Sequence, residues 1–360
     1  MNSFDQHPDL RLLTDLLQIP APSGREERMA AEITHRISTL GCQAQTDPQG
    51  NVWTTIEGRE PSLGAVAVAS HMDELAMVIT AIEPDGRLRV QRSGGLHPWK
   101  LGECPVEIVG DGEATVPAHL SFGSGHTNDP KDPITQFASG SRGITWSDCH
   151  LITGLTPQQL RAAGVRIGSC AVPIPAVRGP HLLGPKDDPL VSAWILDDRG
   201  GSVTLLRLLE RIQETDLIPH RTTHFCFTVQ EEGGLLGAKG WAHRNPVEIF
   251  IAVDSSPIPA GVPLELDGRP AIWSKDSGAH FDQRLIRDLA AAAKRAGTEF
   301  QYAVYSAAAS DATGVIGSGL APRAATVGYP RANSHGYELC RLSVFEHLTA
   351  ALFAYLENLE

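Results

Sequence analysis

The sequence predicts an α/β fold with a mixed sheet, into which a small β-rich domain with barrel-like or PDZ-like architecture is inserted. Apolar strand patterns alternate with helix patterns at both ends of the chain, as in a sheet covered by helices. Between about residues 82 and 184 the pattern changes to short strands with many glycines and prolines. We therefore expect a discontinuous α/β domain, residues 1–80 and 185–360, and an inserted domain, residues 81–184.

The composition is that of an ordinary globular protein, and it narrows the range of functions. The chain has 360 residues, of which 42% are hydrophobic and 20% charged, and its formal net charge is -12. This charge argues against binding of nucleic acid or of an anionic membrane. No apolar run approaches the roughly 18 residues of a membrane span, and the first residues lack a secretory signal pattern. Since span and signal patterns are both missing, we expect a cytoplasmic location. The 6 cysteines form no C-x-x-C pair, so we expect neither a disulfide framework nor a thiolate metal site.

Two helices are expected at the start of the α/β domain. Leucines at helical spacing predict the first over residues 9–18. Ser23 and Glu26 have the spacing of a capping box, which predicts a second helix from this point to about Leu40. Gly41 follows as a C-terminal stop signal.

Strand patterns alternate with helix patterns through the rest of the α/β domain. The expected strands cover residues 51–56, 65–69, 191–196, 225–229, 248–253, 302–305 and 324–328. The second of these is apolar throughout, as in a strand buried on both faces. The expected helices cover residues 202–213 and 281–296, a turn after Asp311, and a closing helix that follows the loop at residues 329–335 and runs to Leu359.

The inserted domain is expected to be built mainly of strands. Their patterns cover residues 106–109, 114–120, 150–153 and 165–172, with one helix pattern at 156–164. A long polar loop occupies residues 121–143. Loops of this length are usually functional or mobile.

Acidic and histidine side chains appear where the predicted strands of the α/β domain end. They are His71, Asp197, Glu231, Glu232, Asp254 and His335. In α/β sheets, ligands bind in the crevice beyond the carboxyl ends of the strands. Two histidines and three carboxylates, with one further carboxylate left free, are what a pair of divalent cations needs if one aspartate bridges them. Such a pair activates water and polarises a carbonyl, so the predicted reaction is a hydrolysis.

Each ligand receives a role in this hypothesis. Asp197 bridges the two cations, His71 and Asp254 complete one site, and Glu232 and His335 complete the other. Zinc, cobalt and manganese all accept such mixed imidazole and carboxylate ligands, so the sequence leaves the metal open.

The remaining acidic side chains are expected to act beside the cations. Glu231 takes a proton from the water and passes it to the leaving amine. Asp73 lies two residues after His71 on an extended chain and so faces the same side, where it can orient the imidazole.

Each of these side chains also has a purely structural interpretation. The glutamate pair could lie in a solvated turn, Asp254 could cap a turn, and His335 could belong to a surface loop. Asp198 could pair with Arg199. Their joint appearance at strand ends favours the metal hypothesis.

Five motifs in order resemble the M42 family of dinuclear metal aminopeptidases, the tetrahedral or glutamyl aminopeptidase group. They are HMDE (71–74), LDDRGG (196–201), VQEEGGLLGA (229–238), VDSS (253–256) and the late loop histidine His335. The resemblance spans nearly the whole chain and implies the metallopeptidase catalytic fold and the same ligand and base roles at the matching residues. It also implies a cis peptide bond between Asp197 and Asp198, dimer contacts made by the insertion, and hollow dodecamers assembled from dimers.

Two segments depart from the family pattern. The residues after the last histidine are Gly336, Tyr337 and Glu338, and the loop at 121–143 matches no pattern of the peptide-trimming members. The substrate and the dodecamer therefore stay open.

The leading hypothesis is an aminopeptidase that acts on short peptides or amino-acid amides. The alternatives are a related dimetal deacylase or carboxypeptidase, a small-molecule amide hydrolase, and a non-catalytic peptide-binding scaffold. A glycosidase is disfavoured, because its two carboxylates flank one bond at roughly 5–9.5 Å and these carboxylates suit metals better. Arg331 is a candidate for binding a substrate carboxylate, while Arg199 is expected to pair with Asp198 or another acid. His280 is a further candidate, with a structural role as the alternative.

Overall fold

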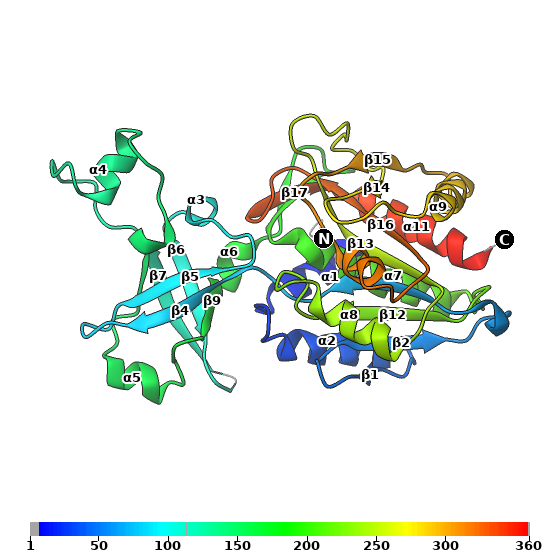
Figure 1. Cartoon of the computed structure of the whole chain (residues 1–360), viewed down its shortest axis with the longest axis horizontal. Coiled ribbons are helices and arrows are strands. Elements are labelled where there is room, and N and C mark those ends of the chain that lie inside the picture. The colour runs from blue at the N-terminus through cyan, green and yellow to red at the C-terminus, as the bar shows by residue number, and fades with distance from the viewer. Residues whose placement is uncertain (1–6, 113, 359–360) are drawn as a thin grey trace. The chain divides into compact units, whose positions relative to one another are not determined.

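In the computed structural model, which describes residues 7–112 and 114–358, the chain forms two compact units (Figure 1). The first unit ends at Glu74 and resumes at Pro180, and we call it the α/β unit. The second, Leu75–Gly179, is called the barrel unit. The expected boundaries, after residues 80 and 184, lie a few residues further along the chain.

The α/β unit is built on an 8-stranded mixed sheet. Its strand order is β1 (Gln45–Thr46), β2 (Val52–Ile56), β12 (Thr223–Thr228), β3 (Val66–His71), β13 (Ile249–Pro257), β16 (Arg323–Arg331), β14 (Ala271–Lys275) and β15 (Gln301–Val304). Strands β12, β3, β13 and β16 form a parallel centre, whereas β2 and β14 pair antiparallel with it. Every residue of β3 is buried, as its apolar run predicts.

Helices pack on this sheet in two groups. One group is α1 (Pro8–Leu17), α7 (Leu196–Glu214), α9 (Gln283–Arg295) and α11 (Ser343–Glu357), and the other is α8 (Leu236–Arg244) and α10 (Asp311–Gly317). Helix α2 (Glu27–Thr39) contacts β2. The leucines of α1 that predicted a helix form its buried face, and each contributes about 1.5–3 kcal/mol on burial.

The capping box predicted for the second helix is wrong. The Ser23 hydroxyl donates to Asp73 Oδ2 at 2.6 Å instead of capping the helix. The Glu26 carboxylate accepts N–H bonds from Gly24 and Gln230, and α2 begins only at Glu27. Folding brings the Asp73 carboxylate close to Ser23, and this bond replaces the expected cap of the helix. Gly41, by contrast, has the positive φ of 78° expected of a helix stop.

Strands β13 and β16 run further than the sequence predicts. They pair in parallel from Ile249 and Arg323 up to Pro257 and Arg331. Asp254 therefore lies within a strand, and residues 329–331, expected in a loop, belong to β16. The pairing of the two strands holds these polar residues extended, although they lack the apolar signal of a strand.

A second sheet of 3 strands was not expected in full. It consists of β10 (His181–Leu183), β11 (Leu190–Trp194) and β17 (Tyr337–Arg341). The prediction that the closing helix follows directly after residue 335 is wrong, because β17 precedes it. Glu338 and Cys340 of β17 are buried and their neighbours are half-buried, which is the period-two pattern of a strand.

The barrel unit contains a closed barrel, which confirms the predicted β-rich insertion. Its strand order is β4 (Ala76–Ile82), β5 (Leu88–Ser93), β8 (His150–Ile152), β7 (Thr115–Ser121), β6 (Cys104–Val109) and β9 (Cys170–Pro173). Short helices complete it: α3 (Pro98–Leu101), α4 (Pro133–Ala138), α5 (Pro157–Ala162), α6 (Pro175–Arg178) and the 3-10 turn η3 (Trp146–Asp148). A further 3-10 turn, η2 (Pro61–Leu63), belongs to the α/β unit.

The long loop expected at 121–143 contains helix α4. Asp132 caps this helix by accepting the N–H bonds of Ile134 and Thr135. As for membrane spans, the described helices include none with the length and apolar character to cross a bilayer.

Candidate metal centre

The strand ends of the parallel centre deliver the predicted site residues to one edge of the sheet. His71 is the last residue of β3, Asp254 is the sixth of the 9 residues of β13, and Glu231 and Glu232 follow β12. His335 follows β16 in the turn before β17. Because the carboxyl ends of parallel strands meet at the same edge, residues far apart in sequence become neighbours.

Asp197 reaches this edge from the second sheet, at the turn from β11 into α7. The peptide bond Asp197-Asp198 is cis, which confirms that expectation. A Cβ atom on Gly201 would collide with the Asp198 carboxylate, and one on Gly200 would come within 2.6 Å of the Tyr329 ring. The glycine pair after the two aspartates is therefore required by close packing.

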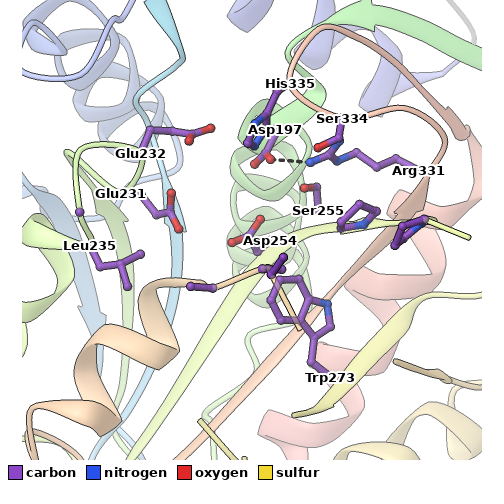
Figure 2. Close-up of a pocket in the computed structure, with 16 residues that line it drawn as sticks. Asp197, Glu231, Glu232, Leu235, Asp254, Ser255, Trp273, Arg331, Ser334 and His335 are labelled. Atoms are coloured by element: carbon purple, nitrogen blue, oxygen red, sulfur yellow. Dashed lines mark hydrogen bonds and ion pairs between the residues drawn. The ribbon is translucent and has the colours of Figure 1, made fainter. Parts of the chain in front are cut away.

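Two groups of candidate metal ligands lie in this cluster, and Figure 2 shows their members Asp197, Glu232, Asp254 and His335. The first is His71, Asp197 and Asp254, and the second is Asp197, Glu232 and His335. Within each group, the ligand atoms lie within 4.8 Å of one another. Asp197 is common to both groups, which is the arrangement expected of a bridging ligand.

The Asp73 side chain connects the end of β3 with the turn that follows β12. Its Oδ1 accepts the N–H of Glu231 at 2.9 Å and lies 3.4 Å from His71 Nδ1. Its Oδ2 accepts the N–H of Glu232 at 3.1 Å and the Ser23 hydroxyl. Burial raises the pKa of Asp73, but the bonds from His71 and Ser23 outweigh it and keep the pKa below its usual value. Asp73 is thus an ionised acceptor that orients both the imidazole and the glutamate turn.

Glu231 lies beside the ligands and is part of neither group found among the described residues. Its Oε2 is 4.0 Å from His71 Nε2. Burial, together with the nearby Asp254 and Glu232, raises its pKa well above the usual value. A carboxyl group with a raised pKa in a cavity is suited to holding a proton during a reaction.

The cluster carries more buried carboxyl groups than its own cations can balance. Burial first, and then mutual repulsion, raises the pKa of Glu232, Asp254 and Asp198 well above their usual values. Asp197 is different, because Arg331 and His71 overcome its burial and lower its pKa. A set of imidazole and carboxylate donors with excess negative charge fits divalent cations.

Glu338 is the main residue of the site to which the sequence assigned no role. Its Oε2 accepts the N–H of Asp197 at 3.0 Å, and its Oε1 accepts the N–H of His335 at 2.9 Å. Its Oε1 also pairs with Arg331 Nη1 at 2.8 Å, and its side chain is 0% exposed. Glu338 therefore fixes the backbones of two candidate ligands that come from different segments. The sequence of β17 carries no local signal for this role, because the charged Glu338 is buried while Leu339 beside it is only half-buried.

Arg331 lies within the centre, between two acids. Its Nη2 contacts Asp197 Oδ2 at 2.7 Å, and its Nη1 contacts Glu338. The pairing of Arg199 with an acid is confirmed, since its Nη2 lies 3.4 Å from Glu74 Oε1. Asp198 accepts the Tyr329 hydroxyl and the N–H of Gly201.

His280 lies apart from the other candidates. It is exposed, and its backbone pairs with Lys275 in an isolated bridge. It is not among the described residues that line the cavity of the site. A substrate-binding role for His280 or for Arg331 stays a prediction.

A cavity of about 570 Å³ opens beside the candidate ligands. Asp197, Glu231, Glu232, Asp254 and His335 all line it. This is the size of a small-molecule or peptide-end site. Glu231 and members of both ligand groups thus face one space, while His71 is not among the described lining residues.

Comparison with known proteins agrees with this geometry. A putative aminopeptidase of Acetivibrio thermocellus is 27% identical over 305 residues, which are 83% of each chain. A glutamyl aminopeptidase of Lactococcus lactis is 29% identical, over 67% of this chain and 65% of the relative. A lysyl aminopeptidase of Pyrococcus furiosus is 26% identical, over 68% of this chain and 66% of the relative.

The fold also matches solved structures. The TET1 peptidase of Pyrococcus horikoshii, described as assembling into a tetrahedron or a large octahedral shell, superposes with a TM-score of 0.84. It is 25% identical, over 98% of this chain and 100% of that structure. A family model for M42 glutamyl aminopeptidases matches residues 50–350. Since that match takes in every strand end that carries a candidate ligand, the chain belongs to the M42 glutamyl aminopeptidase family.

Proposed function

We propose that the chain is a two-metal aminopeptidase that removes N-terminal residues from short peptides or amino-acid amides. The observation that carries the proposal is the position of Asp197, which belongs to both candidate ligand groups, with Glu231 left over beside them. Glu231 is a carboxyl group that the metals do not need, and a hydrolytic site requires such a group for proton transfer. The family membership supports the same activity.

In this proposal His71 and Asp254 hold one cation, Glu232 and His335 hold the other, and Asp197 is shared. Zinc, cobalt and manganese all fit these donors. When bound, such a pair supplies a water of lowered pKa and polarises the carbonyl of the scissile bond. Metal content measured on purified protein after dialysis, independently of turnover, tests this assignment.

Glu231 does the proton chemistry. It accepts a proton from the water that attacks the carbonyl carbon, and it delivers that proton to the nitrogen of the leaving group as the C–N bond breaks. Its burial and its acidic neighbours raise its pKa, which makes it a better acceptor for the proton of the water. Asp73 keeps the Glu231 backbone and the His71 ring in place during both steps.

The protein is also proposed to be a homo-oligomer, built from dimers and extending to a dodecamer. The tetrahedral and octahedral shells of the Pyrococcus horikoshii peptidase support this assembly. So do the large exposed apolar side chains of the barrel unit, where Trp99 is 58% and Ile167 is 63% exposed. Multi-angle light scattering of the purified protein measures the mass that decides it.

A cytoplasmic location is proposed as well. It is supported by the state of the cysteines, since all six have free thiols: Cys42, Cys104, Cys149, Cys170, Cys226 and Cys340. Free thiols on this scale suit a reducing compartment. Fractionation of the cells that express the protein tests the location.

A digest of mixed short peptides tests the activity. Free, N-acetylated and C-amidated peptides are incubated with metal-loaded protein and with Glu231→Gln, and the products are read by mass spectrometry. Stepwise loss of N-terminal residues from free and amidated peptides, absent with the variant, is the expected result. Loss from the C-terminus, or of acetyl groups, would instead indicate a carboxypeptidase or deacylase. If no peptide is cleaved, a small-molecule amide hydrolase or a binding scaffold replaces the aminopeptidase.

A further inference from the structure

We infer that the cavity selects N-terminal residues with uncharged apolar side chains, such as leucine, methionine or phenylalanine. This inference rests on the proposed function, because it concerns the space beside the bond that would be cleaved. It follows from two observations. The side chains that line the cavity away from the candidate ligands are apolar, and the charged side chains nearby already have partners or proposed roles.

The wall of the cavity is apolar on one side. Beyond the acidic cluster it is lined by Leu235, Pro257, Pro259, Trp273, Ala307, Ala308 and Ala309. Figure 2 shows Leu235 and Trp273 beyond Glu231 and Asp254, on the side away from His335. A substrate whose amide lies at the ligands therefore meets an apolar surface with its neighbouring side chain.

Trp273 gives this wall a fixed face. It lies on β14 and is 1% exposed, and its Nε1 donates to Ser256 Oγ at 2.9 Å. Its ring packs against Tyr305 with the ring centres 4.6 Å apart. Because the indole N–H is already bonded within the protein, the small part of the ring that reaches the cavity is apolar.

The alanine segment is also held from behind. The carbonyl of Ala308 accepts both the N–H and the hydroxyl of Ser277. Because residues 307–309 are all alanines, their side chains take up little space, and the cavity has room for a substrate side chain of branched or aromatic size. No longer side chain from this segment fills the space.

Positive charge near the wall is already engaged. Of the described lining residues, Arg331 and His335 can carry it, and Arg331 is paired with Asp197 and Glu338. Lys239 Nζ donates to the carbonyl of Gly234, and Lys275 Nζ donates to that of Asp276. Both lysines keep their charge, but neither is among the described residues that line the cavity. An acidic side chain on the apolar wall would therefore be desolvated away from a lining countercharge.

A basic side chain is disfavoured for the complementary reason. The acids that line the cavity are Asp197, Glu231, Glu232 and Asp254, and each has a place in the proposed metal and proton chemistry. An ammonium group on the apolar wall would lose its hydration without a free carboxylate. The chain is thus expected to differ in specificity from its glutamyl and lysyl relatives.

The test is a comparison of kcat/KM across amino-acid p-nitroanilides. Leucine, methionine, phenylalanine, glutamate and lysine derivatives are assayed with the metal-loaded full-length protein. The expected preference for leucine over glutamate and lysine is on the order of 100-fold. A preference for glutamate or lysine would overturn the inference and leave the aminopeptidase proposal intact. Cleavage of none of the derivatives would overturn both.

A variant of the wall locates the selection. Leu235→Lys places a cation on the apolar side, and it is expected to raise the glutamate to leucine ratio of kcat/KM by at least about tenfold. Leu235→Met controls for the change of side-chain shape, and Ser318→Lys adds the same charge at an exposed residue outside the cavity lining. Both controls should keep the leucine preference. An unchanged ratio in Leu235→Lys, or an equal rise in Ser318→Lys, would show that this wall does not select the side chain.

Discussion

The α/β unit and the barrel unit differ most in how they treat buried charge. In the α/β unit, Asp73, Asp197, Asp198, Glu231, Asp254 and Glu338 are all buried within one region. Among the described residues of the barrel unit, the buried polar side chains are Ser169 and Arg178. Burying a charged group costs several kcal/mol unless the group is paired. A cluster of buried charged groups in one region is therefore a sign of a functional site. The comparison assigns the chemistry to the α/β unit and an ordinary packed core to the barrel.

Substitution of Glu231 should have the largest effect. Glu231→Gln keeps the size of the side chain and removes its ability to take a proton, so turnover should fall by about 10²–10⁴-fold. Metal content should stay at the wild-type level, because Glu231 is in neither candidate ligand group. Steady-state kinetics and elemental analysis on the same sample check both halves. Unchanged turnover would remove Glu231 from the mechanism.

Substitution of Glu338 should have an intermediate effect. Glu338→Gln places an amide against N–H groups that now bond to a carboxylate, those of Asp197 and His335. Metal affinity is expected to fall about 10–100-fold, as for other changes behind metal ligands. Titration calorimetry with zinc measures it.

Glu346→Gln is the matched control for this prediction. It makes the same change on α11, where the Glu346 side chain is 56% exposed and pairs with Arg211. An equal loss of affinity in Glu346→Gln, or none in Glu338→Gln, would contradict the positioning role of Glu338.

Substitution of a carboxylate in the barrel unit, Asp148, should have a small effect, and only on stability. Asp148 receives two bonds from Arg142, at 2.7 and 2.8 Å, and the N–H of Thr145 at 2.9 Å. Asp148→Asn should lower the stability of the barrel by about 1–2 kcal/mol at neutral pH. Turnover and metal content should not change. Hydrogen exchange of the barrel strands measures the loss.

The pH dependence of this difference has a defined sign. The bond from Arg142 lowers the pKa of Asp148 from 3.8 to about 2. When the pKa of a carboxyl group is lower in the folded state than in the unfolded state, its ionised form stabilises the fold at any pH above the unfolded-state pKa. This contribution to stability is lost as the pH falls through the folded-state pKa. Asp148→Asn and wild type should therefore differ fully above about pH 4 and converge near pH 2. A difference that grows on acidification would contradict the account.

Local patterns were enough to pick out the residues that the structure brings together as candidate ligands. His71, Asp197 and Glu232 each follow a run of apolar residues, and a run of that kind delivers its last residue to a sheet edge. The same reasoning found Asp254, although it placed the residue after a strand that in fact continues to Pro257. The error is small because the strand keeps its direction through the polar residues.

What the sequence could not give depends on partners distant in the chain. Ser23 and Glu26 look like a cap, but the Ser23 hydroxyl bonds to Asp73, 50 residues away. The role of Glu338 requires the antiparallel pairing of β17 with β11, which places Ala193 opposite Glu338. No local signal announces such a pairing, because both strands are short and only half apolar.

The most direct test of the central claim is the number of metal ions bound by Asp197→Ala. If Asp197 is shared by both sites, wild type and the barrel variant Asp148→Asn should bind two zinc ions per chain in calorimetric titration. Asp197→Ala should then lose both sites together, while its circular dichroism spectrum stays that of the folded protein. One tight site remaining in the folded variant, or two, would contradict the shared ligand and with it the two-metal centre proposed here.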